Sequence, residues 1–254
     1  MDERSVPIKA AKVSFDVIEA LREREGAGVS ELATALEMPT STIHDHLRTL
    51  EQQGYLVKED GEYRVGARFL ELGEQARSRK KVYGIARPEV DSLAEETGEH
   101  ANLLIEEHGL GVFLYKARGE DAVNLDTHAG MRVLLQTTAL GKTILAYRPR
   151  EEVEAILDEH GLPEITANTV TDRDELLDEL ETIRERDYSI NRGEHFPGVA
   201  AIGTAIVSEP DDAIGAISIS GPLSRMGPER VEEDLAPALM NKKNIIELKL
   251  KRAE

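Results

Sequence analysis

The chain has 254 residues, enough for one large domain or two ordinary ones, and 40% of them are hydrophobic, which is enough for real cores. It contains no cysteine, which excludes a disulfide framework and a thiolate metal site, and no apolar run approaches the roughly 18 residues of a membrane span. The stretch MDERSVPIKAAK lacks the apolar segment of a secretory signal. We therefore expect a soluble, cytoplasmic protein with no membrane partner.

The net charge is −18, from 49 acidic and 31 basic residues, and its distribution is uneven. Residues 1–81 hold 15 acidic and 13 basic side chains, a net of −2, so the other 34 acidic and 18 basic residues carry −16. One interpretation is an acidic docking face for a basic partner. We favour adaptation to a salt-rich cytoplasm, because only 11 of the 31 basic residues are lysine. At 1 M salt the Debye length is about 3 Å, so repulsion from a polyanion would matter little.

The first predicted elements are three helices. Residues 9–24 form an amphipathic helix. Its apolar stripe consists of Val13, Val17, Ile18 and Leu21. A second helix starts near Ser30, whose hydroxyl suits an N-cap, and ends before Pro39. Thr40 or Ser41 can cap a third helix. The buried face of that helix consists of Ile43, Leu47 and Leu50.

The outer face of the third helix is short and polar. It carries Ser41, His44, Asp45, Arg48 and Gln52. A hairpin follows, because residues 55–58 and 62–65 flank Asp60-Gly61, a strong turn sequence. Two helices and a hairpin in this order predict a winged helix-turn-helix, which places one helix in the DNA major groove. The alternative is a helical pair and hairpin used only for packing, but packing does not require this polar face.

We therefore expect the chain to bind double-stranded DNA. The residues expected to contact DNA are Ser41, Thr42, His44 and Arg48 on the helix, with Lys58 and Arg64 on the wing. Arg48 suits a bidentate contact to guanine. Because one helix covers only a few base pairs, we expect a homodimer or a tetramer that binds an inverted repeat.

Beyond the wing, a connecting helix is predicted over 67–82. It carries a basic cluster, which suits either phosphate contact or a solvated linker: Arg77, Arg79, Lys80 and Lys81. Further helices are predicted from Arg87-Pro88 and near 139–147, 150–160, 172–187 and 228–250, the last with Pro237 as the place for a kink. Strands are predicted over 101–106, 111–117, a third candidate at 123–126, and over 199–208 and 213–220, joined across 209–212. This order indicates an α+β domain around an antiparallel sheet.

Several separated motifs, in this order, resemble the IclR family of transcription regulators over nearly the whole chain. Residues 41–56, from Ser-Thr-Ile-His to Gly-Tyr-Leu, are similar to the family's helix-turn-helix segment, and 63–66 and 70–73 match the stretch after it. Residues 130–142 are similar to its G-x-x-x-P-L-H-x-T-A-x-G-K stretch, and 198–206 and 217–222 fit its closing strands. The sequence departs from the family pattern at Asp45, His46, Leu134 and Gln136.

The resemblance implies an α+β two-domain protein: a winged helix-turn-helix (1–66), a linker helix (67–82) and a GAF-like effector-binding domain with an antiparallel sheet flanked by helices (83–254). It also implies a small effector, often a carboxylate or an aromatic acid. By similarity, the effector-binding residues are Ala139, Leu140, Asn191, Ala201, Ser218 and Ser220. Helix N-termini attract anions, and two serines two positions apart on a strand point to the same side. The alternative is that both serines face solvent.

The predicted function is sequence-specific regulation of a metabolic, chiefly catabolic, gene set by a carboxylate or sugar-acid effector, in a halophilic archaeon. The alternative is a metabolite-binding protein or enzyme that keeps the helix-turn-helix only for assembly. We expect no catalytic residue, cofactor or metal: Gly141-Lys142-Thr143 lacks the first glycine of a phosphate loop, and the histidines show no ligand spacing. A metal contact through Glu194 and His195 stays an alternative.

Overall fold

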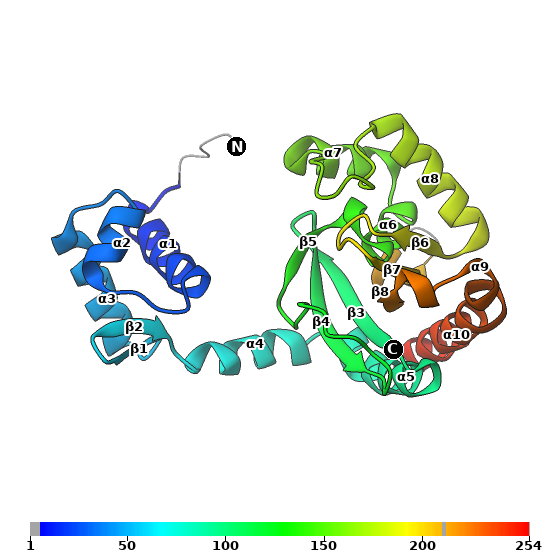
Figure 1. The fold of residues 1–254 in the computed structure, drawn as a ribbon, viewed down its shortest axis with the longest axis horizontal. Helices are drawn as coiled ribbons and strands as arrows, with labels where there is room; N and C mark the ends of the chain where they lie inside the picture. The colour runs from blue at the N-terminus through cyan, green and yellow to red at the C-terminus, as the bar shows by residue number, and fades with distance from the viewer. Residues whose placement is uncertain (1–5, 210–211, 254) are drawn as a thin grey trace. The chain divides into compact units, whose positions relative to one another are not determined.

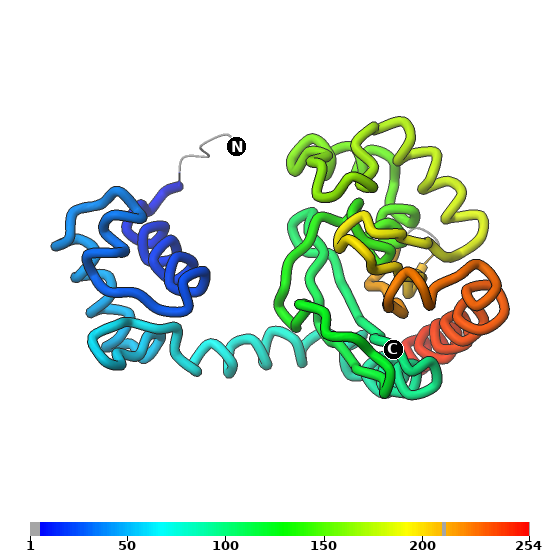
Figure 2. The backbone as a smooth tube through the Cα atoms, in the orientation of Figure 1, coloured from blue at the N-terminus to red at the C-terminus, as the bar shows by residue number. Residues whose placement is uncertain are grey.

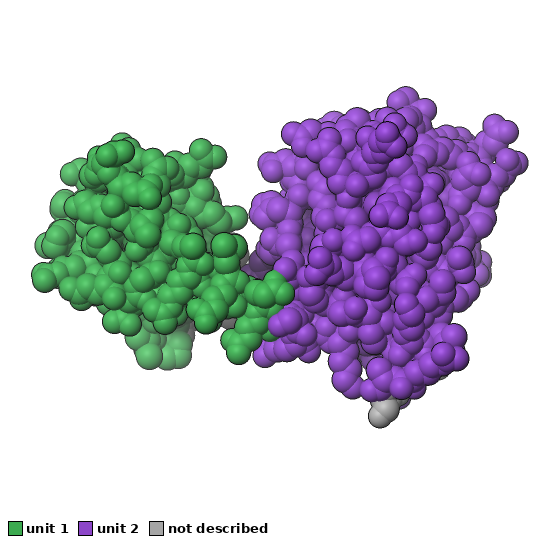
Figure 3. Space-filling view, turned by 90° about the horizontal axis from the view of Figure 1, so that it is seen from below, with its two compact units in different colours: residues 1–76 green, residues 77–254 purple. Residues whose placement is uncertain are grey.

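A computed structural model of the chain describes residues 6–209 and 212–253, so Pro210 and Asp211 of the predicted turn at 209–212 lie outside the described residues. The chain divides into two compact units, residues 1–76 and 77–254 (Figure 3). Each unit has its own buried apolar cluster. No described helix is both long and apolar enough to cross a membrane.

Unit 1 is a winged helix-turn-helix (Figure 1). Its elements are α1 (Lys9–Glu23), α2 (Val29–Ala35), α3 (Thr40–Gln52), β1 (Leu56–Glu59), β2 (Glu62–Val65) and most of α4 (Arg68–Ser78). The predicted apolar faces meet in one core, whose fully buried members include Val17, Leu21, Leu32, Ile43, Leu47 and Leu56. The amphipathic period of the helices therefore located this core correctly.

The hairpin turn is set by backbone conformation. Asp60 and Gly61 both have positive φ, 51° and 91°, as a two-residue type I′ turn requires. Gly54, with φ of 76°, ends α3 in the left-handed region, where glycine has no Cβ to clash. These two points turn the chain back on itself within a few residues and confirm the predicted wing.

Two predicted helix caps are wrong. Helix α2 begins at Val29, so Gly28 is its N-cap and Ser30 lies inside the first turn. The Gly28 N–H donates to Glu31 Oε2 at 2.8 Å, which satisfies the helix start without a hydroxyl. Helix α3 begins at Thr40 directly after Pro39, and no side chain caps it.

Unit 2 is built on a six-stranded sheet within the described residues, in the order β5-β4-β3-β8-β7-β6, with every neighbouring pair antiparallel. The strands are β3 (His100–Glu107), β4 (Leu110–Arg118), β5 (Arg132–Leu134), β6 (Ser189–Arg192), β7 (Val199–Glu209) and β8 (Asp212–Pro222). The predicted pairs of long strands are therefore present and form the centre of one curled sheet.

Helices cover both faces of this sheet. On one face α5 (Lys81–Thr97) and α10 (Ala236–Arg252) run side by side (Figure 2). They pack on Ile202, Ile217 and Ile219. The apolar cluster of the opposite face joins Leu104, Ala205 and Ala216 to three helices: α6 (Ala139–Ala146), α7 (Arg150–His160) and α8 (Arg173–Arg186). The predicted α+β arrangement is confirmed.

Some predicted elements differ from the structure. Helix α5 begins at Lys81, and Pro88 lies inside it rather than at its start. Residues 123–126 form no strand, whereas the short edge strands β5 and β6 were not predicted. Three- and four-residue strands are too short to show a period of two, which explains why the sequence pattern missed them.

The last predicted helix is interrupted. It consists of α9 (Pro228–Arg230), a π-helical turn (Val231–Leu235) and α10. Pro237, in the first turn of α10, has no N–H to donate, and the wider π-turn before it accommodates the missing bond. The helix is therefore irregular near Pro237, as predicted, but the irregularity is a π-helical turn just before the proline.

Candidate functional site

The outer face of α3 is open to contact from outside. Ser41, His44 and Arg48 are exposed, and Thr42 is half-buried against the domain. Within the described part of the chain, no hydrogen bond or ion pair engages the Arg48 guanidinium. His44 Nδ1 lies 3.6 Å from a carboxylate oxygen of the adjacent Asp45. The helix therefore presents an unengaged cation beside hydroxyl and imidazole groups.

The two predicted wing cations differ in their surroundings. Lys58 is exposed, and its ammonium lies 4.9 Å from the centroid of the Tyr63 ring. Arg64 is directed back into unit 1, where its guanidinium donates to the Glu25 carbonyl and, at 2.8 Å, to Glu62 Oε2. Lys58 is thus available to an outside anion, whereas Arg64 joins β2 to the end of α1.

His46, one of the departures from the family pattern, has a structural explanation. Its Nδ1 lies 2.8 Å from Ser14 Oγ, which links α3 to α1. The contact is part-buried. The hydrogen bond therefore gives the polar His46 ring a partner where these two helices meet.

In unit 2 the strand register brings small and polar residues into two neighbouring rows across the sheet. One row consists of Ser189, Gly203, Ser218 and Asn102, and the other of Asn191, Ala201, Ser220 and His100. Directly paired residues of an antiparallel sheet point to the same face, and so do residues two apart on one strand. Both rows therefore lie on one face, and the apolar packing of the sheet is interrupted there.

The N-terminus of α6 rests on these rows because Gly203 has no side chain. A Cβ at Gly203 would lie 3.0 Å from the Ala139 carbonyl carbon. Ser189 Oγ donates to the Ala139 carbonyl at 2.7 Å and fixes the same contact from β6. Thr138 caps the helix by accepting from the Gly141 N–H at 3.0 Å. The N–H groups of Ala139 and Leu140, in the first turn, have no partner within the helix.

A cavity, part of it open to solvent, lies between this helix start and the two rows. All six residues that the family resemblance suggested line it: Ala139, Leu140, Asn191, Ala201, Ser218 and Ser220. The structure thus brings together residues that are up to 81 positions apart in the sequence, from Ala139 to Ser220.

Nine further lining residues were not among those predicted to bind the effector, although His195 was considered as a metal contact: Asn102, Phe113, Leu125, Thr127, Thr137, Thr138, His195, Phe196 and Val199. Thr138 has the hydroxyl and position of an N-cap, which was a usable indication. Asn102, a polar residue in an apolar strand, was another. The aromatic and loop residues gave no such indication in the sequence.

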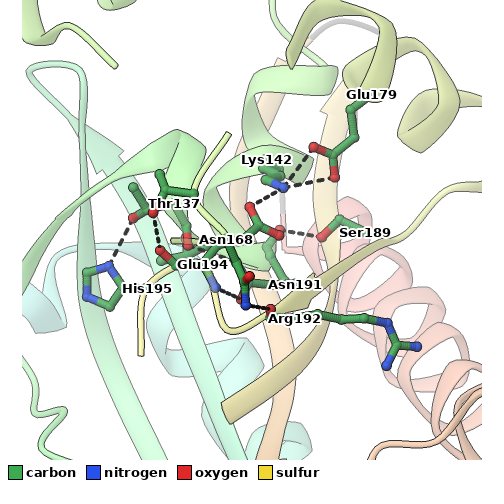
Figure 4. Close-up of polar contacts among 12 residues, drawn as sticks. Thr137, Lys142, Asn168, Glu179, Ser189, Asn191, Arg192, Glu194 and His195 are labelled. Atoms are coloured by element: carbon green, nitrogen blue, oxygen red, sulfur yellow. Dashed lines mark hydrogen bonds and ion pairs between the residues drawn. The ribbon is translucent and has the colours of Figure 1, made fainter. Parts of the chain in front are cut away.

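Hydrogen bonds to Thr137 hold the end of β6 and the loop after it, residues 193–198, at one side of the cavity (Figure 4). Asn191 donates to the Thr137 carbonyl at 2.8 Å and accepts from the Glu194 N–H at 3.2 Å, so both of its amide atoms are engaged. Thr137 donates to the Leu134 carbonyl, so its oxygen accepts from His195 Nδ1, 3.0 Å away. Burial lowers the pKa of His195, which favours the neutral ring.

A buried charged cluster lies behind the cavity. Lys142, in α6, has its ammonium 2.8 Å from Glu179 Oε2 and pairs also with Glu194 (Figure 4). Burial raises the pKa of the Glu194 carboxyl, and the Lys142 ammonium opposes that shift. The Gly141-Lys142-Thr143 triplet is therefore structural. Glu194 and His195 have different partners, and the described residues contain no group of three metal-ligating side chains.

None of the described residues that line the cavity is a lysine or an arginine. The hydrogen-bond donors that it offers are backbone N–H groups, hydroxyls, amides and an imidazole. They lie among apolar side chains such as Phe113 and Leu140. Such a lining suits a small ligand with an apolar part and a few oxygen atoms.

Two protein-family models match the chain. The model of the C-terminal domain of bacterial IclR transcriptional regulators matches residues 74–245, and the model of the IclR helix-turn-helix domain matches residues 10–60. The chain belongs to the IclR family of transcriptional regulators. Proteins of this family bind DNA through the first domain and a small-molecule effector through the second, so both predicted activities hold at the level of the family.

Individual IclR relatives agree. The chain is 32% identical over 244 residues to a probable HTH-type transcriptional regulator, ArcR, of Halobacterium salinarum, covering 94% of this chain and 93% of that one. The crystal structure of the Thermotoga maritima IclR is 30% identical with a TM-score of 0.78, covering 95% and 98%. An IclR homologue from Microbacterium hydrocarbonoxydans, complexed with 4-hydroxybenzoate, is 25% identical with a TM-score of 0.81, covering 96% and 100%. The named relatives are regulators rather than enzymes, which weighs against the enzyme alternative.

Proposed function

We propose that this IclR-family regulator controls a metabolic, chiefly catabolic, gene set by binding a specific operator, and that a small carboxylate or sugar-acid effector in the unit 2 cavity changes its affinity for that operator. The observation that carries the proposal is the convergence of the α6 N-terminus with Ser218 and Ser220 on one cavity. The Microbacterium homologue, which was crystallised with 4-hydroxybenzoate, supports an organic acid as the ligand class.

The acid is held by neutral donors. Backbone N–H groups at a helix N-terminus favour an anion, and hydrogen bonds to a charged group contribute about 1.5–3 kcal/mol each. Ser218 is fully buried and Ser220 nearly so, which keeps their hydroxyls away from competing water. Since the chain carries a net charge of −18, long-range attraction of an anion is unfavourable and this local geometry must provide the affinity.

The operator is contacted by the outer face of α3 and by the wing. Ser41, Thr42 and His44 contact bases or the nearest phosphates, and Arg48, which no described side chain engages, pairs with a guanine. Lys58 contacts phosphate. Arg64 would reach the backbone only by leaving Glu25 and Glu62, so we assign it chiefly to holding the wing in place.

A homodimer or tetramer that binds an inverted repeat follows from the small footprint of one α3 helix. In this proposal residues 1–66 bind DNA, 67–82 connect, and 83–254 bind the effector. Effector binding alters DNA affinity only if it favours one of two arrangements of the chain, which defines the coupling to be measured.

The test is the double substitution Ser218→Ala/Ser220→Ala, with operator binding followed during titration of organic acids. We expect the ligand response to be lost and the affinity of the ligand-free protein for DNA to stay. Ser208→Ala is the matched control, because Ser208 lies on β7 and bonds to Asp212 at 2.6 Å, outside the cavity. An unchanged response in the double variant would place the effector site elsewhere.

A further inference from the structure

Asn102 occupies a central place in the cavity that the proposed function leaves unexplained. It lies on β3 directly opposite Ser218 of β8, lines the cavity and is only 4% exposed. Its Nδ2 donates to Ser218 Oγ and to Ser220 Oγ, at 3.2 Å each. One side-chain amide therefore organises both serines.

The amide determines what the serines can offer to a ligand. An NH₂ group only donates, so both serine oxygens act as acceptors toward it, and their protons must point elsewhere. Among the described residues neither hydroxyl has a protein acceptor for its proton. Ser218 and Ser220 thus present two O–H donors to the cavity, which suits the two oxygens of one carboxylate.

The other amide atom creates a second requirement. Asn102 Oδ1 is fully buried and has no hydrogen-bond partner in the described part of the chain. A buried acceptor without a partner costs free energy, so a ligand that brings a donor to this atom gains affinity over one that does not. Because Oδ1 and Nδ2 share one carbon, that donor must stand close to the carboxylate.

We propose that Asn102 selects a hydroxy acid whose hydroxyl is on the carbon next to the carboxylate. The carboxylate accepts from the two serines and from the first N–H groups of α6, and the hydroxyl donates to Asn102 Oδ1. This inference rests on the proposed function, since it takes the cavity to be the effector site. It narrows the ligand from any organic acid to one that carries a neighbouring hydroxyl.

The competing arrangement is the reversed amide. Turned over, Asn102 would accept from both serines and present its NH₂ group to the ligand, which would favour an acceptor such as a keto oxygen. Hydroxy acid and 2-oxo acid are therefore opposite predictions of the two orientations. Acids of one size that differ only at this carbon distinguish them.

The experiment measures the affinities of lactate, pyruvate and propionate, and of mandelate, phenylglyoxylate and phenylacetate, for the full-length protein by calorimetry. We expect the hydroxy acid to bind about tenfold tighter than the unsubstituted acid in at least one series, since one hydrogen bond is gained. In Asn102→Leu, which keeps the branched shape but has no polar atom, this preference should disappear. Thr204→Val is the control, because the buried Thr204 hydroxyl donates to the Asp187 carbonyl, outside the cavity.

Three results would overturn the assignment. Equal affinity for hydroxy and unsubstituted acids, or a preference for the oxo acid, would show that Asn102 Oδ1 does not bind a ligand hydroxyl. The proposal of an organic-acid effector would not be affected. If the preference for the hydroxy acid survives in Asn102→Leu, another residue contacts the hydroxyl. If none of the six acids binds while the protein still binds its operator, the cavity takes no small monocarboxylate. That part of the proposed function then fails together with the hydroxy-acid proposal, and the two failures are thereby distinguished.

Discussion

The two units place their functional groups in opposite environments. In unit 1 the candidate groups, such as Arg48 and Lys58, are exposed side chains on regular elements. In unit 2 they are buried polar groups, such as Asn102 and Ser218, enclosed by packing. A DNA-contacting face therefore depends on which side of a single helix is exposed. An effector cavity depends on how several strands and helices pack together.

The same contrast appears in two lysine–carboxylate pairs of nearly equal length. Lys12 and Asp16 of α1 are 2.7 Å apart with the lysine side chain 57% exposed, and Lys142 and Glu179 are 2.8 Å apart with the lysine side chain 1% exposed. Water solvates and screens the first pair but not the second. Distance alone therefore does not indicate how much a pair matters to stability.

The largest expected effect is that of a methyl group at Gly141. A Cβ there would lie 2.1 Å from the Leu135 carbonyl oxygen, which is backbone and cannot move away cheaply. We expect Gly141→Ala to destabilise unit 2 by about 5 kcal/mol or more, in the exceptional class of substitutions. Thermal unfolding should show loss of the unit 2 transition with that of unit 1 preserved.

Gly84→Ala is the matched control for Gly141→Ala. Gly84 is also helical, within α5, and nothing lies within 4 Å of a Cβ built on it. Alanine should raise stability by about 0.5–1 kcal/mol, since it lowers the entropy cost of the helix. If the two alanine substitutions change the stability equally, the close backbone contact at Gly141 does not determine the stability of unit 2.

The second expected effect is that of removing each lysine. Lys142→Met leaves Glu179 and Glu194 facing each other without their cation and should cost about 3–5 kcal/mol. Lys12→Met should cost at most about 1 kcal/mol, as exposed pairs do. Chemical denaturation of both variants measures the difference. Comparable losses would show that burial does not set the strength of these pairs.

The third prediction concerns DNA recognition. Arg48→Ala should weaken binding to the operator by about 1–3 kcal/mol, the value of one bidentate base contact, and weaken non-specific binding much less. Arg22→Ala, which removes an equal charge from an exposed site on α1, is the control. Gel shifts with operator and with scrambled DNA at one salt concentration give both affinities. An equal loss on both DNAs would make Arg48 a phosphate contact.

The smallest expected effect is a pH dependence specific to unit 2. Burial depresses the pKa of His195 below 6.5, so the folded state keeps the ring neutral while the unfolded chain binds a proton. Its contribution to stability is complete above pH 6.5 and is lost as the pH falls from there toward the depressed pKa. His195→Gln should flatten this fall in melting temperature. An identical pH profile would show that His195 titrates alike in both states.

Local sequence features determined unit 1 almost completely. The spacing of Ile43 and Leu47 located the buried face of α3 and hence its outer face, because the helical period is fixed at 3.6 residues. Asp60-Gly61 determined the wing, since few other residue pairs adopt two positive φ values. The long strands and main helices of unit 2, and through motif resemblance the six cavity residues, were also accessible from the sequence.

Tertiary structure alone decided the rest. Which residue caps α2 depended on where the turn before it placed the Gly28 N–H against Glu31, and the edge strands β5 and β6 exist only because β4 and β7 offer them partners. The roles of Asn102 and Lys142 arise from cross-strand register and helix packing, which join residues distant in the chain. A sequence pattern reports local periodicity and turn chemistry, but the partner of a buried polar group is chosen by contacts that no local pattern records.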